Sequence, residues 1–322
     1  MKELEIGLEK QKSFDGLVAQ SKLMQDIFWK INLAAENDIT VLISGESGTG
    51  KELVAKSIHH RSQRSGGPFI PINMGAVTRD LAPSELFGHV KGAFTGATEL
   101  RDGLFENASG GTLFLDEVST LDNKTQTSLL RILENREFRR VGGKKTIYTD
   151  ARIIAATNKD LRKAVEEGTF RKDLYFRLEV FTITLPPLRE RWIDIPLLIK
   201  EFIKRFNKDM GKHVKKVSKD AIDYLIKYEW PGNVRELKNV IQRAMLLSKK
   251  NIITAEFLPD RMITDHSQNK NLEIEIGLPL REVEKRYIER TLWWSRGNRV
   301  KAASMLGITR RTLYNKIDEY NL

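Results

Sequence analysis

Cysteine is absent from this chain of 322 residues, and histidine is scarce. Without thiols the protein has neither disulfides nor thiolate metal sites, and a reducing compartment, the cytoplasm, is its expected setting. The histidines lack the spacing of a zinc-binding helix, so we expect no structural transition metal. They are His59, His60, His89, His213 and His266.

Long apolar runs are missing as well. No run approaches the roughly 18 residues that a membrane helix requires, and we expect no membrane span. The first six residues are too acidic and too weakly apolar for a signal peptide.

Charged residues, in contrast, are plentiful, at 30% of the chain beside 40% hydrophobic residues. This balance is typical of a packed globular protein, and the length suggests two or three domains. The formal net charge of +11 favours a polyanionic partner, either nucleic acid or nucleotide. A basic surface that is simply solvated is the alternative.

Five short runs of apolar residues alternate with helical segments in the first part of the chain. Continuous apolar strands separated by helices predict a parallel sheet that is covered on both faces. The runs occupy residues 39–43, 69–72, 112–115, 152–156 and 181–185.

The strand signal stops after Pro186 and Pro187. Residues 195–260 carry apolar side chains at helical spacing and predict a helical subdomain. Residues 265–271 are polar and indicate a linker. The last segment, residues 279–322, is short, basic and helical.

A glycine-rich loop follows the first predicted strand and opens a helix, which is the context that a phosphate-binding loop needs. Its backbone N–H groups can surround phosphate oxygens, and Lys51 can reach the β- and γ-phosphates. The generic motif continues with Ser or Thr for magnesium, whereas Glu52 stands here, so a plain glycine turn is the alternative. The loop comprises Gly45, Glu46, Ser47, Gly48, Thr49, Gly50 and Lys51.

Two carboxylates, Asp116 and Glu117, end the third predicted strand. Asp116 is placed to hold Mg²⁺, directly or through water, and Glu117 could polarise an attacking water. A helix N-cap is the alternative role for Asp116. At the ends of other strands, Asn73 and Thr157 could hydrogen-bond phosphate or water, or could simply be turn residues.

The C-terminal segment predicts a helix, a turn and a second helix. Ala302 and Ala303 permit close helix approach, Gly307 supplies the turn and Thr309 caps the second helix. Polar residues of that helix are left to face a DNA major groove and its phosphates, while a helical hairpin with a solvated basic face is the alternative. They are Thr309, Arg310, Arg311, Thr312, Tyr314, Asn315 and Lys316.

Six residues between the phosphate loop and the carboxylates have no evident use in nucleotide chemistry: Gly92, Ala93, Phe94, Thr95, Gly96 and Ala97. A glycine-flanked Phe in a mobile loop suits contact with another protein, and a tight surface hairpin is the alternative. With residues 85–91 and the motifs above, this insert resembles the bacterial enhancer-binding proteins, AAA+ ATPases that activate RNA polymerase carrying the sigma-54 factor.

The resemblance covers nearly the whole chain and implies its fold class. This is an α/β AAA+ P-loop parallel sheet with helices on both faces, followed by an α-helical lid subdomain and a small all-α Fis-type helix-turn-helix domain. Family members usually carry a regulatory domain before the ATPase, so either a separate regulatory protein controls this chain or the chain is a fragment. The expected boundaries are 1–13 for a lead, 14–185 for the α/β subdomain, 186–262 for the lid, 263–278 for a linker and 279–322 for the DNA-binding domain.

For the nucleotide site, the resemblance implies ATP and Mg²⁺ as cofactors. Glu is common in this family at the position of Glu52, so this residue supports the resemblance to the enhancer-binding proteins. Asn73 would be the switch residue that restrains Glu117, and Arg235 the second sensor. The other implied nucleotide-binding residues are Leu17 and Val18 against adenine, Thr157 and Asn158 as the first sensor, and Ala108, Ser109, Gly110 and Gly111.

Arg171 and Arg177 resemble the family's arginine-finger segment, in which a neighbouring subunit offers a guanidinium to the γ-phosphate. Six residues along a helix correspond to about 240°, so the two side chains need not point the same way. Ion pairing to Asp173 or Glu179 is the alternative.

The resemblance also implies the partners. Phe94 and Thr95 would contact the sigma-54 factor of the RNA polymerase holoenzyme, with a second loop at residues 140–145 beside them near promoter DNA. ATP would lie between the subunits of a hexameric ring, the helix at residues 280–294 could pair two copies, and the C-terminal helices would bind double-stranded DNA. A repressor that uses ATP only as a ligand and a helicase or unfoldase are the alternatives, against which Glu117, Arg171 and residues 92–97 argue.

Overall fold

A computed structural model describes residues 4–5, 13–248, 251–264, 274, 277–295, 297–320 and 322. These residues form two compact units. The sheet unit comprises Gly7–Gly211 and Trp230–Gln242, and the C-terminal unit comprises Met1–Ile6, Lys212–Glu229 and Arg243–Leu322.

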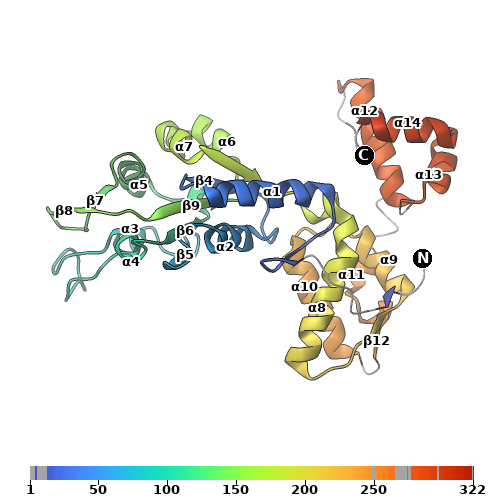
Figure 1. Ribbon diagram of the computed structural model, residues 1–322, viewed down its shortest axis with the longest axis horizontal. Helices are drawn as coiled ribbons and strands as arrows, with labels where there is room; N and C mark the ends of the chain where they lie inside the picture. Colours follow the sequence, from blue (N-terminus) through green and yellow to red (C-terminus); the bar gives the residue numbers. More distant parts are fainter. Residues whose placement is uncertain are drawn as a thin grey trace. The chain divides into compact units, whose positions relative to one another are not determined.

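A five-stranded sheet forms the centre of the sheet unit (Figure 1). Every pairing in it is parallel, and the five strands predicted from the sequence are the five that form it. Because parallel strands end at one edge of a sheet, the residues that follow them gather there. The strand order is β10 (Phe181–Thr184), β4 (Val41–Ser44), β9 (Arg152–Thr157), β6 (Thr112–Asp116) and β5 (Phe69–Asn73).

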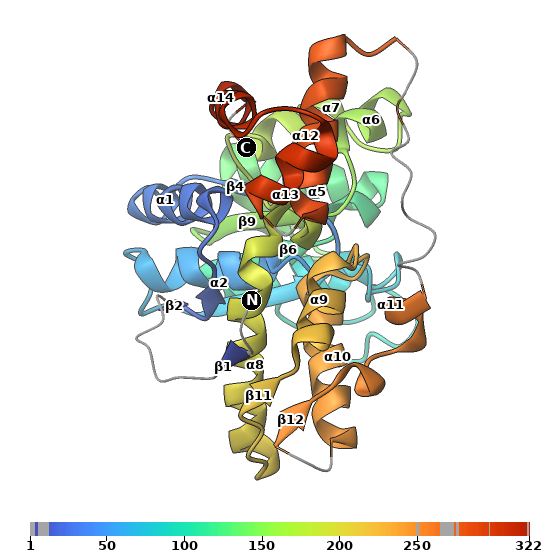
Figure 2. The same ribbon diagram turned by 90° about the vertical axis from the view of Figure 1, so that its right-hand side faces the viewer.

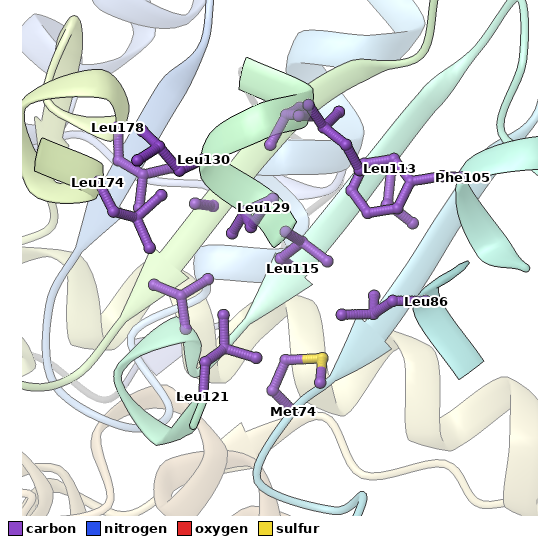
Figure 3. Close-up of a cluster of buried hydrophobic side chains, with 14 of the residues drawn as sticks. Met74, Leu86, Phe105, Leu113, Leu115, Leu121, Leu129, Leu130, Leu174 and Leu178 are labelled. Atoms are coloured by element: carbon purple, nitrogen blue, oxygen red, sulfur yellow. The ribbon is translucent and has the colours of Figure 1, made fainter. Parts of the chain in front are cut away.

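Both faces of the sheet are buried, as predicted. Successive side chains of a strand point to opposite faces, so Leu113 and Leu115 belong to one hydrophobic cluster and Phe114 to another. Helices α5 (Asn123–Asn135) and α7 (Lys172–Leu178) contribute Leu129, Leu130, Leu174 and Leu178 to the first cluster (Figure 3). Helices α1 (Lys22–Glu36) and α2 (Lys51–Arg61) cover the second cluster.

Short elements complete the sheet unit. Two antiparallel hairpins, which the sequence did not predict, pair β2 (Ser13–Phe14) with β3 (Leu17–Val18) and β7 (Glu137–Arg139) with β8 (Thr146–Tyr148). A 3-10 segment, η2 (Leu188–Asp194), leads into α8 (Ile195–Met210), and α10 (Asn233–Leu247) begins in this unit. The remaining elements are α3 (Ala82–Phe87), α4 (Leu104–Asn107), η1 (Val118–Thr120) and α6 (Leu161–Glu166).

The C-terminal unit contains α9 (Lys219–Lys227), η3 (Ala255–Phe257) and α11 (Asp260–Thr264), and also a small sheet. The prediction that strands stop after Pro187 was wrong here, because β11 (Lys216–Val217) pairs with β12 (Ile252–Ile253) and with β1 (Leu4–Glu5) (Figure 2). Strands of two residues are too short to show a period in the sequence. The predicted linker at residues 265–271 lies outside the described residues.

Three helices end the chain: α12 (Leu280–Trp294), α13 (Arg299–Leu306) and α14 (Arg310–Tyr320). Gly307 joins the last two with a φ of 67°, and Ala302 and Leu313 are fully buried in their common core, as predicted for a helix-turn-helix. Among the residues described, no helix is long and apolar enough to cross a membrane.

Candidate functional site

The phosphate loop joins β4 to α2 at the carboxyl edge of the sheet. Gly45, Gly48 and Gly50 have φ angles of 149°, 79° and 109°, which residues with a Cβ rarely adopt. Within residues 13–248, most backbone N–H groups in and just after the loop donate to no protein acceptor. They form an anion-binding cradle at the N-terminus of α2. They belong to Glu46, Ser47, Gly48, Gly50, Lys51, Glu52 and Leu53.

Lys51 lies across this loop as the first residue of α2, with 8% of its surface exposed. Its Nζ donates to the carbonyl oxygens of Gly45 (2.8 Å) and Glu46 (3.1 Å). Burial lowers the pKa of Lys51, although the nearby Asp116 acts in the opposite direction. The loop therefore holds a partly desolvated cation, which phosphate oxygens would compensate.

Glu46, inside the loop, is held by two residues that sequence reasoning missed. Arg189 of η2 donates to both carboxylate oxygens, at 2.9 and 2.6 Å. Nδ2 of Asn233, at the start of α10, donates to Glu46 Oε2 (3.1 Å) and to the carbonyl of Ser47 (3.0 Å). The arginine hydrogen bonds hold the pKa of Glu46 below its usual range. In the sequence, the one signal that could have pointed to Asn233 is its position two residues before Arg235.

The next three loop residues are held in the same way. Arg235 donates from its guanidinium to Ser47 Oγ (2.9 Å) and from its backbone to the carbonyl of Gly48 (3.3 Å). Arg191, which is 3% exposed, donates to the carbonyl of Thr49 (2.9 Å). The predicted second sensor thus lies beside the phosphate loop.

The two carboxylates lie at the same edge, at the end of β6. One oxygen of Asp116 accepts the N–H of Glu117 (2.9 Å), and its other oxygen has no protein donor within residues 13–248, which suits a cation ligand. Glu117 has a left-handed backbone, with φ 57°. A Cβ on Gly75 would overlap Oε2 of Glu117 and lie 3.1 Å from Oδ1 of Asn73. The predicted switch residue and the predicted base therefore converge on one glycine.

The predicted first sensor is also at this edge. Thr157 pairs with Ser44 across the sheet, and its carbonyl accepts the N–H of Gly45 (3.2 Å). Its hydroxyl accepts from the N–H of Lys159 (3.0 Å) and donates to the carbonyl of the same residue (3.1 Å), which fits the turn alternative for this side chain. Asn158 is exposed.

Leu17 and Val18 are buried in β3, and Leu17 Cδ2 would lie 3.9 Å from a Cβ on Gly50. The predicted adenine segment therefore lies next to the phosphate loop. The structure does not bring the remaining predicted nucleotide segment there. Ala108, Ser109, Gly110 and Gly111 precede β6 and lie at the opposite edge of the sheet, where Ser109 and Gly110 donate to Asp150.

Of the two candidate arginine fingers, Arg171 is the N-cap of α7 and Arg177 lies in its last turn, and neither makes a hydrogen bond or ion pair to the phosphate loop within residues 13–248. Arg171 donates to both oxygens of Asp173 (3.0 and 2.7 Å). Arg177 lies 3.5 Å from Glu134 and not beside Glu179. Both guanidinium groups are well exposed, and ion pairs of this kind are weak enough to be exchanged for another partner.

The six-residue insert forms a closed loop between α3 and α4. The N–H of Gly92 donates to the carbonyl of Ala97 (2.8 Å), and Gly92 and Gly96 have φ angles of 79° and 99°. Phe94 is 41% exposed, and its ring packs edge-on against His89 at 5.0 Å. The loop is therefore a surface hairpin that presents Phe94 and Thr95 to solvent.

The second predicted loop lies beside the first, as expected. The N–H of Val90 donates to the carbonyl of Val141 (3.1 Å), and a Cβ on Gly142 would lie 2.9 Å from Cβ of Ala93. Arg140 anchors the base of this second loop through Glu106 and Asp102. The two loops form one projection from the sheet unit (Figure 1).

On α14, Arg310 and Arg311 are exposed and make no ion pair within residues 297–320, and Thr312 and Asn315 are exposed too. Thr309 caps the helix, because its hydroxyl accepts the N–H of Thr312 (3.1 Å). The two remaining candidates are engaged within the domain. The ring of Tyr314 lies under Arg299, and Nζ of Lys316 donates to Glu284 of α12 (2.9 Å).

Family models match most of the chain. Residues 17–184 match a sigma-54 interaction domain, residues 189–274 an AAA+ ATPase lid domain, and residues 279–320 a bacterial regulatory protein of the Fis family.

Known proteins align with nearly the whole of this chain. Regulatory protein AtoC of Escherichia coli is 46% identical over 316 residues, which cover 95% of this chain and 68% of AtoC. Nitrogen fixation protein VnfA of Azotobacter vinelandii is 46% identical over 311 residues, which cover 95% of this chain but only 59% of VnfA. The crystal structures of NtrX from Brucella abortus with ADP and with ATP have TM-scores of 0.76 at 34% identity and cover 95% of this chain and 70% of NtrX. The chain therefore belongs to the sigma-54-dependent transcriptional activators, with a sigma-54 interaction domain, an AAA+ lid and a Fis-type helix-turn-helix.

Proposed function

We propose that this chain hydrolyses ATP and uses the energy to remodel the closed complex of sigma-54 RNA polymerase at a promoter. It would do so in the cytoplasm as a hexameric ring, held at upstream DNA sites by its C-terminal helices. The observation that supports the ATPase most strongly is the cradle of unused N–H groups. It lies beside a desolvated Lys51 and at the same sheet edge as Asp116 and Glu117.

The residues at this edge fit ATP and magnesium. The cradle and Lys51 would bind phosphate oxygens, and the free oxygen of Asp116 would hold Mg²⁺. Glu52 turns away toward Lys56 (2.6 Å), so it leaves the metal to Asp116 and water. When bound, ATP supplies the phosphoryl group and Mg²⁺ neutralises charge on it.

The chain's own groups would then drive hydrolysis. Glu117 orients and polarises the attacking water, and Asn73, beside it at Gly75, restrains that carboxylate until ATP is bound. Arg235, in the first turn of α10, contacts the phosphates. Arg171 or Arg177 of a neighbouring subunit leaves its carboxylate partner, Asp173 or Glu134, and contacts the γ-phosphate instead.

The conformational change that follows hydrolysis would be transmitted to the polymerase through the two projecting loops. Asn73 ends β5, and the chain from there leads through α3 into the loop of Phe94 and Thr95. A shift at the Glu117 edge would therefore move this loop against the sigma-54 factor, with the second loop beside it near promoter DNA. The C-terminal helices would contact DNA phosphates and bases through Arg310 and Arg311.

The alternative, a DNA-binding repressor that uses ATP only as a ligand, makes the opposite prediction for turnover. We expect the wild-type chain to release phosphate from ATP. Glu117→Gln should retain ATP binding and lose turnover by at least about 100-fold, because an amide cannot act as a base. Phosphate-release assays and nucleotide titrations on the wild type and Glu117→Gln distinguish an ATPase from a repressor that only binds ATP. No turnover by the wild type at saturating ATP would favour the repressor.

A further inference from the structure

The contacts between the phosphate loop and the segments after the sheet carry a further inference. Glu46 places a carboxylate inside a loop that is built to bind anions, and this charge would repel phosphate. Arg189 and Asn233 occupy both of its oxygens, so the charge is matched inside the protein. The acidic side chain therefore serves a contact within the protein.

Asn233 is built to make that contact. It is fully buried, has a left-handed backbone with φ 51°, and uses its whole side-chain amide. Its Oδ1 accepts the N–H of Leu188 (2.8 Å) in η2, and its Nδ2 donates to Glu46 and Ser47. One side chain thus joins η2, α10 and the phosphate loop.

The backbones at this place are in direct contact. The N–H groups of Val234 and Arg235 lie 3.0 and 3.3 Å from the carbonyl of Gly48. A Cβ on Gly48 would overlap the carbonyl oxygen of Gly232 and lie 3.1 Å from Cβ of Arg235. The position of Arg235 is therefore set by this contact as well as by any ligand.

We propose that Glu46, Arg189 and Asn233 form a clamp that positions the guanidinium of Arg235 for the γ-phosphate of ATP. This inference rests on the proposed function. The three are positioning residues, because they act through Arg235. The clamp predicts that its loss affects ATP more than ADP, and that the effect disappears when Arg235 is already gone.

A double-mutant cycle tests the clamp in the full-length chain. ATP and ADP titrations and steady-state kinetics are measured for the wild type, Arg189→Gln, Arg235→Gln and the double variant. We expect Arg189→Gln to raise the Kd for ATP by about tenfold, but by less than about twofold in the Arg235→Gln background. The Kd for ADP should change by less than about twofold throughout.

Matched variants separate positioning from damage. Glu46→Gln removes the ion pair and keeps an acceptor for Asn233, so it should reproduce Arg189→Gln and serve in its place if that variant fails to fold. Arg205→Gln, which breaks an exposed ion pair to Asp209 on α8, should leave both affinities unchanged. Thermal melting checks that each variant is folded.

Two results would overturn the clamp. Additive effects of the two substitutions would show that Arg189 does not act through Arg235. Equal losses of ATP and ADP affinity would show a general distortion of the loop. A wild-type chain that binds neither nucleotide would instead overturn the proposed function, and the clamp with it.

Discussion

At the residue scale, one glycine allows a close contact beside the predicted base that no larger residue would permit. Gly75 is necessary because the Glu117 carboxylate occupies the space that a side chain would take. Gly66 differs, since a Cβ there would have no neighbour within 4 Å. The two positions offer a matched pair, because an added methyl group would meet the Glu117 carboxylate at Gly75 and open space at Gly66.

Gly75→Ala should lower kcat and leave ATP binding nearly intact, because the added methyl displaces Glu117 without touching the phosphate loop. We expect a loss of about 10- to 100-fold in kcat, comparable to the misplacement of a general base. Gly66→Ala is the control and should hydrolyse ATP at the wild-type rate. Equal activity of the two variants would mean that the position of Glu117 at Gly75 is not the one used in turnover.

At the opposite sheet edge, Asp38 accepts two hydrogen bonds from Arg64 (2.8 and 2.7 Å), which hold the pKa of Asp38 below its ordinary value of 3.8. A carboxylate with a depressed pKa stabilises the folded state above its unfolded pKa, and this contribution is lost as pH falls through the folded pKa. Asp38→Asn should therefore be less stable than the wild type at neutral pH, by at most about 1 kcal/mol because the Asp38 side chain is half exposed.

The difference in unfolding free energy between Asp38→Asn and the wild type should shrink once the pH drops below 3.8. Denaturant titrations at several pH values measure it. A difference that stays constant down to the lowest pH would show that the ion pair is not its source.

Among the elements, α14 shows how packing divides one helix into different roles. Lys316 donates to Glu284 and lies near Glu319, and these partners raise its pKa above its usual range. Arg310 and Arg311, at the other end of the helix, have no such partner among the described residues of this domain. Arg310 and Arg311 can therefore bind phosphate without breaking an ion pair, whereas Lys316 would first have to leave Glu284.

Arg310→Ala and Arg311→Ala should each weaken DNA binding and reduce the slope of log K against log salt by about one phosphate contact. Lys316→Ala should leave the slope nearly unchanged, since its charge is already paired. Fluorescence anisotropy with a DNA duplex at several salt concentrations measures both. If Lys316→Ala changed the slope as much as the arginine variants, its pairing with Glu284 would not persist on DNA.

How far the sequence predicts the structure depends on the element. The five sheet strands were predictable because each is a continuous apolar run, and the residues after β4 and β6 carry polar motifs that a parallel sheet brings to one edge. The strands of two residues were not predictable. Nor was the hold of Arg189 and Asn233 on Glu46, which depends on chain segments that meet only in three dimensions. Ala108 to Gly111 show the converse, because nearness in sequence to Asp116 does not place them at its edge.

For the whole molecule, the proposed function requires that nucleotide turnover and promoter opening be separable. Thr95 is exposed at the tip of a closed loop, and no described residue of the nucleotide site touches it. A substitution there should leave turnover intact and remove only the contact with the polymerase. That separation would not exist in a repressor for which ATP is only a ligand.

The most direct test is therefore transcription in vitro from a sigma-54 promoter, run beside an ATPase assay on the same preparation of Thr95→Ala. We expect hydrolysis within about twofold of the wild type and promoter opening reduced by at least about tenfold, because an exposed contact residue contributes to binding of the partner and not to chemistry. Full transcription by Thr95→Ala, or parallel loss of both activities, would contradict the coupling role of this loop.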